Sequence, residues 1–408
     1  MSWRRFLPAL ALLALACASE DRLAPTVAPE PPDPDAPLER AVLERWLTSR
    51  GAAIDNLIVA WDVDAEMVDW AEAQVRPGRA EDRLRALAAA LLGDAAVDRE
   101  IKESAPADST SSNASGGQAA VALRYTAERT ATAREAFDTG RANCLAFTNL
   151  FLGLARALGH DAYFLAIETV ETIRREGDLV IVSDHVGVGW GAGSSRLVFD
   201  FSATPSSERR LRRLTDLRAL AMFHSNRGAE AVRGGEPIAA VTWLERAVEI
   251  DPGFAPAWVN LGVARRRAGD VEGAEDAYRK ALLIDPRAAS AGRNLIGLLR
   301  SDDRLGEAEA VRQALAEAPG RDPFTHLLLA DLARSAGRLG EAERFYRRAE
   351  RLGDAEVRSE ALSGRGLLAL RGNDRRAAGR LLRDAAALEV SIGVRQRQLK
   401  ALLDARKP

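Results

Sequence analysis

The sequence is poor in the residues that bind metals or form disulfide networks. Its 408 residues include two cysteines, Cys17 and Cys144, and four scattered histidines. Because Cys17 lies in a segment that we expect to be modified, one thiol remains and no disulfide framework is expected. One free cysteine and four separate histidines offer no cluster of metal ligands. We therefore expect neither a metal site nor a bound cofactor.

The chain also lacks a surplus of charge of one sign. Its formal net charge is −2, so no global attraction to nucleic acid or anionic lipid is expected. The basic run at residues 209–213 could form a local patch. Leucines recur around it at helical spacing, at positions 211, 214, 217 and 220. This spacing favours a solvated helix with one buried side, and we expect no nucleic-acid partner.

The chain begins with a short charged segment followed by a short apolar one. Residues 1–17 read MSWRRFLPALALLALAC, in which Arg4 and Arg5 precede an apolar run from Phe6 to Ala16. A membrane-spanning helix needs about 20 apolar residues. The run is therefore too short to span a bilayer, and it is typical of a cleaved signal peptide.

The end of this segment resembles a bacterial lipoprotein signal, because the small residues around Leu15 lead directly into Cys17. The resemblance implies that Cys17 is acylated and anchors the protein to a membrane of the bacterial cell envelope. By the enteric sorting rule, Ala18 indicates the periplasmic face of the outer membrane. Plain secretion, or release into the periplasm, is the alternative. Residues 18–37 are rich in proline and acid, which predicts an extended tether.

The length and the hydrophobic content of 47% suit two or three domains. Apolar residues recur every three or four positions through residues 38–102, which predicts helices. Residues 104–117 have almost no apolar content and predict a flexible surface loop.

The next segment, residues 120–203, changes character. An apolar helix follows Cys144 and closes at Gly159. Three runs rich in β-branched and aromatic residues come after it, at 161–168, 179–190 and 196–201. A helix followed by an antiparallel meander predicts an α+β domain over residues 38–205.

From residue 221 to 392 the pattern is helical and periodic. A connecting helix is expected at 206–220, and about five repeats follow, best defined at 221–254 and 255–288. The second repeat contains Trp258, Leu261, Gly262, Ala274, Tyr278, Ala281 and Pro286. The repeat before it carries Gly228, Ala240, Leu244, Ala247 and Pro252 at equivalent positions. The pattern resembles the tetratricopeptide repeat, which implies an all-α solenoid that binds a protein or peptide in its groove.

Cys144 is the candidate nucleophile, because it lies where a loop becomes the apolar helix. The dipole and the free N–H groups of a helix N-terminus stabilise a thiolate, which is the attacking form. A buried and inert cysteine at a helix end is the alternative from position alone.

Two further residues complete a candidate triad, each expected in the middle of a strand. His185 lies in SDHVGVGW and Asp200 lies in LVFDFS. Since side chains alternate along a strand, Asp184 points away from the face that carries His185. Asp200 can orient His185 from the neighbouring strand, and a carboxylate between two phenylalanines needs a partner.

The order of these residues resembles the transglutaminase-like superfamily over residues 120–203. The segment GRANCLAFTNLFLGLARALGHDAYF resembles its cysteine segment, DHVGVGW its histidine strand and VFDF its aspartate strand. The resemblance implies a papain/transglutaminase-like fold with Cys144 as nucleophile, His185 as general base and acid, and Asp200 as the orienting group. One departure is Ala142, where the family usually has glycine.

Two functions from different classes follow. The first is an envelope enzyme that forms an acyl-thioenzyme and passes the acyl group to water, as a peptidase or amidase, or to an amine, as a transglutaminase. The second is a non-catalytic scaffold whose repeats bind a partner and whose cysteine domain is degenerate. A third signal, Gly187–Ala192 (GVGWGA), matches a dinucleotide fingerprint, but a strand and not a helix is expected after it, so we interpret it as a hairpin turn.

Overall fold

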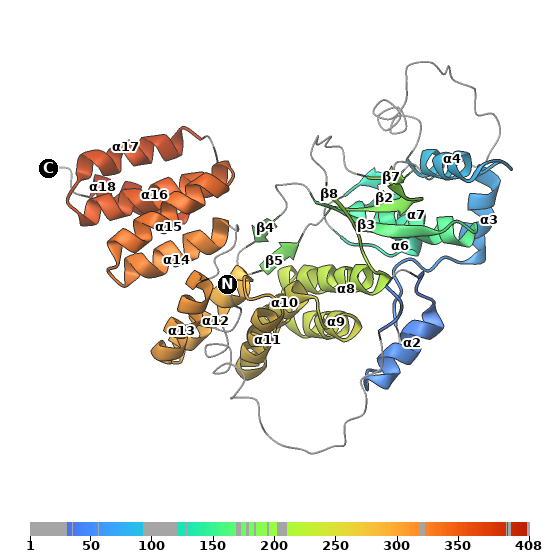
Figure 1. Ribbon diagram of the computed structural model, residues 1–408, viewed down its shortest axis with the longest axis horizontal. Coiled ribbons are helices and arrows are strands. Elements are labelled where there is room, and N and C mark those ends of the chain that lie inside the picture. Colours follow the sequence, from blue (N-terminus) through green and yellow to red (C-terminus); the bar gives the residue numbers. More distant parts are fainter. Residues whose placement is uncertain are drawn as a thin grey trace, which may run out of the picture. The chain divides into compact units, whose positions relative to one another are not determined.

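The computed structural model divides into two compact units (Figure 1). It describes residues 31–34, 36–55, 57–92, 121, 123–126, 129–168, 173–176, 179–182, 185–193, 196–201, 210–317, 323–388, 390 and 393–405. The described residues from 31 to 264, apart from Leu179, belong to the first unit, and Leu179 and the described residues from 265 to 405 belong to the second. The boundary near residue 264 differs from the predicted connector at 206–220, because the first helices of the repeat region belong to the first unit.

The first unit begins with helices, as the pattern of residues 38–102 predicts. They are α2 (Arg40–Ser49), α3 (Ala65–Gln74) and α4 (Ala80–Leu92). Asp64 starts α3, since its carboxylate accepts a hydrogen bond from the N–H of Met67 at 3.1 Å. The buried residues of α4 recur at helical spacing and include Leu84, Leu87, Ala88 and Leu91.

Helix α7 (Cys144–Ala157) is the core of the first unit. All of its residues from 145 to 155 are buried. It contacts α3, α4 and α6 (Ala133–Thr139), and also the main sheet. The predicted closure at Gly159 is confirmed, because Gly159 adopts a positive φ of 82° just after the helix.

The main sheet has four strands in the order β7-β6-β3-β8, and every pair in it is antiparallel. The strands are β3 (Ala162–Glu168), β6 (His185–Trp190), β7 (Leu197–Phe199) and β8 (Arg210–Arg213). Two separate two-stranded sheets also form: β1 (Arg124–Tyr125) with β2 (Arg141–Ala142), and β4 (Ile173–Glu176) with β5 (Leu179–Val182). Helices and an antiparallel sheet agree with the α+β class, while the papain/transglutaminase-like fold stays a prediction.

Two sequence predictions about this sheet are wrong. The run at 179–190 forms two strands, of which β5 pairs with β4 and β6 joins the main sheet. The segment at 206–220 is not one helix, because Arg210–Arg213 pairs with the open edge of β3. Backbone pairing at that edge satisfies N–H and C=O groups that a helix would leave unpaired in β3. Helix α8 (Asp216–Arg233) begins only after Thr215, whose hydroxyl accepts from the N–H of Arg218 at 3.1 Å.

The rest of the described chain is a series of helical hairpins. Their helices are α8, α9 (Pro237–Ile250), α10 (Ala255–Ala268), α11 (Val271–Ile284), α12 (Ala289–Ser301), α13 (Leu305–Glu317), α14 (Pro323–Ser335), α15 (Leu339–Leu352), α16 (Ala355–Arg371) and α17 (Arg375–Ala386). A further helix, α18 (Val394–Asp404), follows them. The described residues therefore form five hairpins, where the sequence predicts about five repeats.

The hairpin turns keep the period of the sequence. A residue with positive φ occurs in each turn, at Gly235, Gly269, Asp303, Gly337 and Asn373. The first four recur at the constant interval of the tetratricopeptide repeat, and the last is displaced by two positions. The sequence shows the same shift in its final copy. Gly228 illustrates close packing within a hairpin, because a Cβ there would lie 2.4 Å from the side chain of Leu244.

Candidate functional site

Cys144 is the first residue of α7, as the sequence predicts, and its thiol is free and half-buried. The preceding residue, Asn143, caps the helix: its side-chain oxygen accepts a hydrogen bond from the N–H of Ala146 at 2.8 Å. The N–H groups of Cys144 and Leu145 have no acceptor within the helix. They are therefore suitably placed to stabilise a negative charge at the thiol or on a bound carbonyl oxygen.

The cap is held by residues from outside α7. Nδ2 of Asn143 donates to Oγ1 of Thr130 at 3.0 Å, and the N–H of Thr130 donates to the carboxylate of Glu230 at 2.7 Å. Arg227 donates to the carbonyl oxygen of Thr130 at 3.2 Å. Burial raises the pKa of Glu230, although the bond from Thr130 favours its charged form. A chain of hydrogen bonds thus runs from α8 to the start of α7.

Thr148 ties the first turn of α7 to the sheet. Its hydroxyl oxygen lies 2.7 Å from the carbonyl oxygen of Cys144 and 2.9 Å from that of Val186. Val186 is the neighbour of His185 on β6. The turn that begins with Cys144 therefore lies directly against the start of the strand that carries His185.

The strand register brings His185 and Asp200 to neighbouring strands. The backbone of His185 pairs with Ile167, and Phe199 pairs with Val188. Continuing the second register by one residue sets Asp200 opposite Gly187, on the same side of the pleat as position 185. The two residues lie at strand ends, not mid-strand as predicted: His185 begins β6 and Asp200 follows the end of β7.

Two contacts between aromatic rings hold the Asp200 segment against α7. The ring of Phe199 lies 4.5 Å from that of Phe151, and the ring of Phe201 lies 4.8 Å from that of Phe147. These contacts place the end of β7 alongside α7. The side chain of His185 lies outside the described residues, so contact among the three predicted catalytic side chains stays a prediction.

Several other predicted features lie outside the described residues. They are Cys17 with the signal segment 1–17, most of the tether at 18–37, and the loop at 104–117. Where the structure describes the chain, no helix is long and apolar enough to cross a membrane. The same parts contain no group of three His, Cys, Asp or Glu side chains that could hold a metal ion.

The glycine-rich segment after His185 is a hairpin, as predicted. Gly187 and Gly189 lie within β6, Gly191 turns with a φ of 76°, and the antiparallel strand β7 follows. A Cβ at Gly187 would lie 2.7 Å from the carbonyl oxygen of Phe199. The glycine is therefore needed for close packing of two strands, and the dinucleotide interpretation is not supported.

Two features of this region go beyond the sequence predictions. The first is Thr148, for which a hydroxyl in an apolar helix, four residues after the candidate nucleophile, is a usable sequence signal. The second is the buried ion pair between Arg156 and Asp216, with N–O distances of 2.6 and 3.0 Å. It joins the end of α7 to the start of α8, and Asp216 accepts in addition from the N–H of Leu38 at 2.8 Å.

Comparisons with known proteins concern the repeats. Residues 255–288 match the family model of the tetratricopeptide repeat. Cellulose synthase 1 operon protein C of Komagataeibacter xylinus is 28% identical over 132 residues, which are 29% of this chain and 10% of that protein. The chain thus spans about a tenth of the length of this relative.

Solved structures resemble the helical region at low similarity. Pseudomonas aeruginosa pilF has a TM-score of 0.37 and 22% identity, covering 45% of this chain and 83% of its own. MamA from Desulfovibrio magneticus RS-1 has a TM-score of 0.32 and 21% identity, covering 41% and 94%. The family match and the periodic hairpins together show that this chain contains a solenoid segment of tetratricopeptide repeats.

Proposed function

We propose that the chain is a scaffold of the bacterial cell envelope that holds a protein partner on its repeat array. The observation that carries this proposal is the run of packed helices from α11 to α17 in the second unit, because stacked hairpins present an extended binding surface. Exposed apolar side chains add to it. Val271, Leu305 and Leu339 recur at the first position of α11, α13 and α15, and they are 45%, 57% and 37% exposed.

Site-specific photo-crosslinking in the full chain tests this proposal. A photoreactive amino acid at position 271 or 305 is expected to yield the same protein adduct in living cells. Ile54, which is 39% exposed and lies far from the repeats in sequence, supplies the control position. Adducts at position 54 alone, or at none of the three, contradict a partner-binding role for the array.

A second candidate is favoured by the position of Cys144. A free thiol at a helix start, one turn from a residue that contacts the histidine strand, suits attack on an amide carbonyl. In this proposal Cys144 attacks the carbonyl carbon, and His185 accepts the proton of the thiol and passes it to the leaving amine. Asp200 orients the imidazole. The repeats then recruit the substrate.

Trapping of the acyl-enzyme tests the second candidate. Full-length protein with Cys17→Ser is incubated with an amide-containing acyl probe, and Cys144→Ala is the matched control. A thioester adduct on Cys144 that disappears in His185→Ala supports acyl transfer. Labelling equal to that of Cys144→Ala contradicts it. Release of the adduct by water or by an added primary amine distinguishes an amidase from a transglutaminase.

The lipid anchor is a separate proposal. It is supported by the resemblance of residues 1–17 to a lipoprotein signal. Growth with an alkyne-bearing fatty acid is expected to label the wild type and not Cys17→Ser, and to place the labelled protein in the membrane fraction. Equal labelling of both proteins contradicts acylation at this cysteine.

A further inference from the structure

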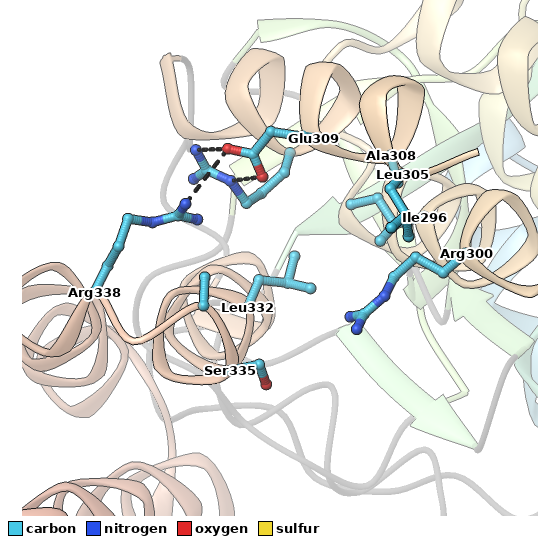
Figure 2. A pocket seen from close by; sticks show the side chains of 10 residues that line it. Ile296, Arg300, Leu305, Ala308, Glu309, Leu332, Ser335 and Arg338 are labelled. Atoms are coloured by element: carbon cyan, nitrogen blue, oxygen red, sulfur yellow. Dashed lines mark hydrogen bonds and ion pairs between the residues drawn. The ribbon is translucent and has the colours of Figure 1, made fainter. Parts of the chain in front are cut away.

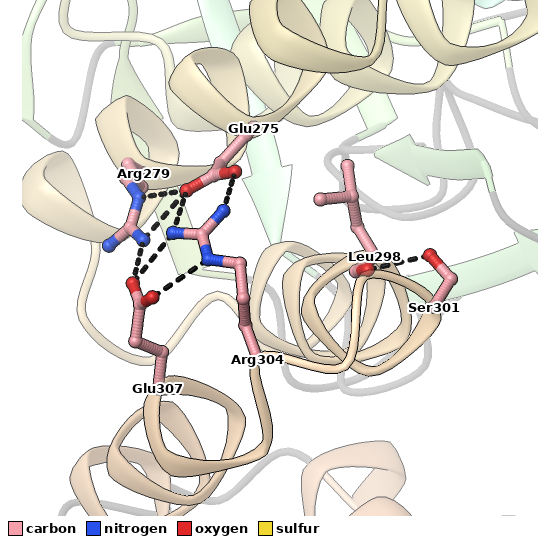
Figure 3. Close-up of polar contacts among 6 residues, drawn as sticks. All are labelled: Glu275, Arg279, Leu298, Ser301, Arg304 and Glu307. Atoms are coloured by element: carbon pink, nitrogen blue, oxygen red, sulfur yellow. Dashed lines mark hydrogen bonds and ion pairs between the residues drawn. The ribbon is translucent and has the colours of Figure 1, made fainter.

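Two junctions between hairpins of the second unit occupy corresponding places in the repeat. In the earlier one, two arginines and two glutamates saturate one another (Figure 3). Arg304 bonds Glu275 at 2.6 and 3.0 Å and Glu307 at 2.7 Å from each of two nitrogens. Arg279 bonds the same two carboxylates, each at 2.9 Å. Such bidentate pairs leave little capacity for another ligand.

A similar group lies one repeat later, with some longer contacts and with its first arginine at 312, one position before the equivalent of Arg279. Arg312 bonds Glu309 at 2.8 Å from each of two nitrogens and Glu341 at 3.3 Å. Arg338 lies 2.7 Å from Glu341 and 3.6 Å from Glu309. One terminal nitrogen of Arg338, Nη2, is buried without a hydrogen-bond partner among the described residues.

A pocket of about 210 Å³ opens beside this second junction, at the ends of α12 and α14 and the start of α13 (Figure 2). Its middle is apolar, formed by Ile296, Leu305, Ala308, Leu332 and Ala336. Arg300 extends towards the side that Leu332 and Ser335 form, and Arg338 approaches from the opposite side. Among the described residues no acid lies within ion-pair distance of Arg300.

The sequence of the preceding repeat differs from this one at one position beside the pocket. Arg266 is the equivalent of Arg300 in the preceding repeat, and Asp302 is likewise the equivalent of Ala336. Of the four residues that bond one another in the first junction, three have an identical equivalent in the second: Glu309, Arg338 and Glu341. Gln313 stands at the position equivalent to Arg279, and the neighbouring Arg312 takes its place. With Arg300, the second junction therefore has three arginines and two acids, and Ala336 stands where the preceding repeat has an aspartate.

We propose that this pocket binds an acidic side chain together with a neighbouring apolar one, both from an extended segment of a partner protein. The inference rests on the proposed scaffold function and adds the chemistry of the partner. The volume is below the roughly 300–1,000 Å³ of small-molecule sites, so it suits one or two side chains. A carboxylate would meet Arg300, and Leu305, which is 57% exposed, would cover the apolar neighbour.

Fluorescence anisotropy with defined peptides tests the proposal on the full chain. The probe is a labelled peptide of four Leu-Glu pairs with blocked ends, compared with Leu-Gln and Ala-Glu versions. Only the Leu-Glu peptide is expected to bind saturably. Arg300→Gln should weaken binding about tenfold, the usual effect of losing one charge-assisted hydrogen bond. Ala336→Asp should weaken it similarly, because it places an acid of the chain itself in the pocket that Arg300 lines.

Two variants serve as controls. In Ala336→Asn, the asparagine side chain has nearly the shape of the aspartate in Ala336→Asp but carries no charge. Arg380→Gln removes an exposed arginine of α17, away from the pocket in sequence. Both should bind the probe as the wild type does. Equal losses in the Asp and Asn variants, equal losses in the two Arg→Gln variants, or no saturable binding would overturn the proposal. Photo-crosslinks that persist in Arg300→Gln would then leave the scaffold function standing without this pocket.

Discussion

Two neighbouring polar residues inside α7 differ in how their hydrogen bonds are met. Thr148 is fully buried, and its hydroxyl reaches two carbonyl oxygens. Asn149 is also fully buried, yet neither atom of its amide group has a hydrogen-bond partner among the described residues. A buried polar group without a partner loses its hydrogen bonds to water and forms none in the protein, which lowers stability. Thr148 therefore stabilises the junction of helix and sheet, whereas Asn149 weakens the core.

Substitution of these residues is expected to change stability in opposite directions. Asn149→Leu should raise the free energy of unfolding by about 1–2 kcal/mol, because it removes unsatisfied polar atoms at similar volume. Thr148→Val should lower it by about 1 kcal/mol, since the hydroxyl hydrogen bond is lost while the shape is kept. Urea unfolding monitored by tryptophan fluorescence measures both. A loss of stability in Asn149→Leu would mean that the amide has a partner outside the described residues.

At the scale of elements, helix α8 belongs to two parts of the molecule. It is the first helix of the hairpin series, and its Glu230 and Arg227 also bond Thr130, which supports the cap of α7. Its Asp216 bonds Arg156 at the end of α7. These bonds explain why the first hairpin belongs to the unit that contains α7 and not to the second unit. The start of α7 thus depends on a helix that the sequence assigns to another domain.

This dependence predicts an effect of Glu230 on the thiol. Glu230→Leu removes the acceptor of the Thr130 N–H, which should loosen Asn143 and fray the first turn of α7. Alkylation of Cys144 by iodoacetamide should then be slower, since the helix N–H groups that stabilise the thiolate are less ordered. Glu230→Gln keeps an acceptor oxygen and should react as the wild type does.

The alkylation rates are compared in a Cys17→Ser background at several pH values. Asn143→Ala, which removes the cap directly, should resemble Glu230→Leu and cost about 1 kcal/mol of stability. Equal rates in Glu230→Leu, Glu230→Gln and the parent would show that α8 does not influence the cysteine.

The elements also show what sequence can and cannot predict here. Helix α7 and the hairpins follow from local patterns: periodic apolar residues, and turn residues that recur with the period of the repeat. Strand β8 could not be predicted in this way, because its arginines and leucines also fit a helix and only the open edge of β3 decides the outcome. The division of residues 179–190 into β5 and β6 likewise depends on tertiary pairing, because β5 pairs with β4 whereas β6 pairs with β3 and β7. The contact between Thr148 and Val186 is tertiary, so the spacing of residues in the sequence does not reveal it.

At the scale of the whole molecule, we expect the stability of the first unit to depend on pH through a buried histidine. His224 of α8 is 3% exposed, and its Nε2 lies 3.1 Å from the carbonyl oxygen of Ile58. Burial lowers the pKa of His224 to about 4, and the nearby Arg246 and Arg227 act in the same direction. In the unfolded chain this pKa is about 6.5. Below that value the unfolded state binds a proton that the folded state refuses, so stability falls as pH falls.

Integration between these two pKa values predicts a loss of about 2 kcal/mol between pH 7 and pH 5 from this residue alone. His224→Gln keeps a donor for Ile58 and cannot titrate, so its stability should fall less steeply over the same range. Tryptophan fluorescence suits the measurement, because residues 46, 61, 70, 190, 243 and 258 all lie in the first unit. Burial also lowers the pKa of His160, so the stability of His224→Gln should still decrease somewhat as pH falls. Identical slopes in wild type and His224→Gln would mean that His224 is already protonated in the folded protein, or that this unit opens before the histidine titrates.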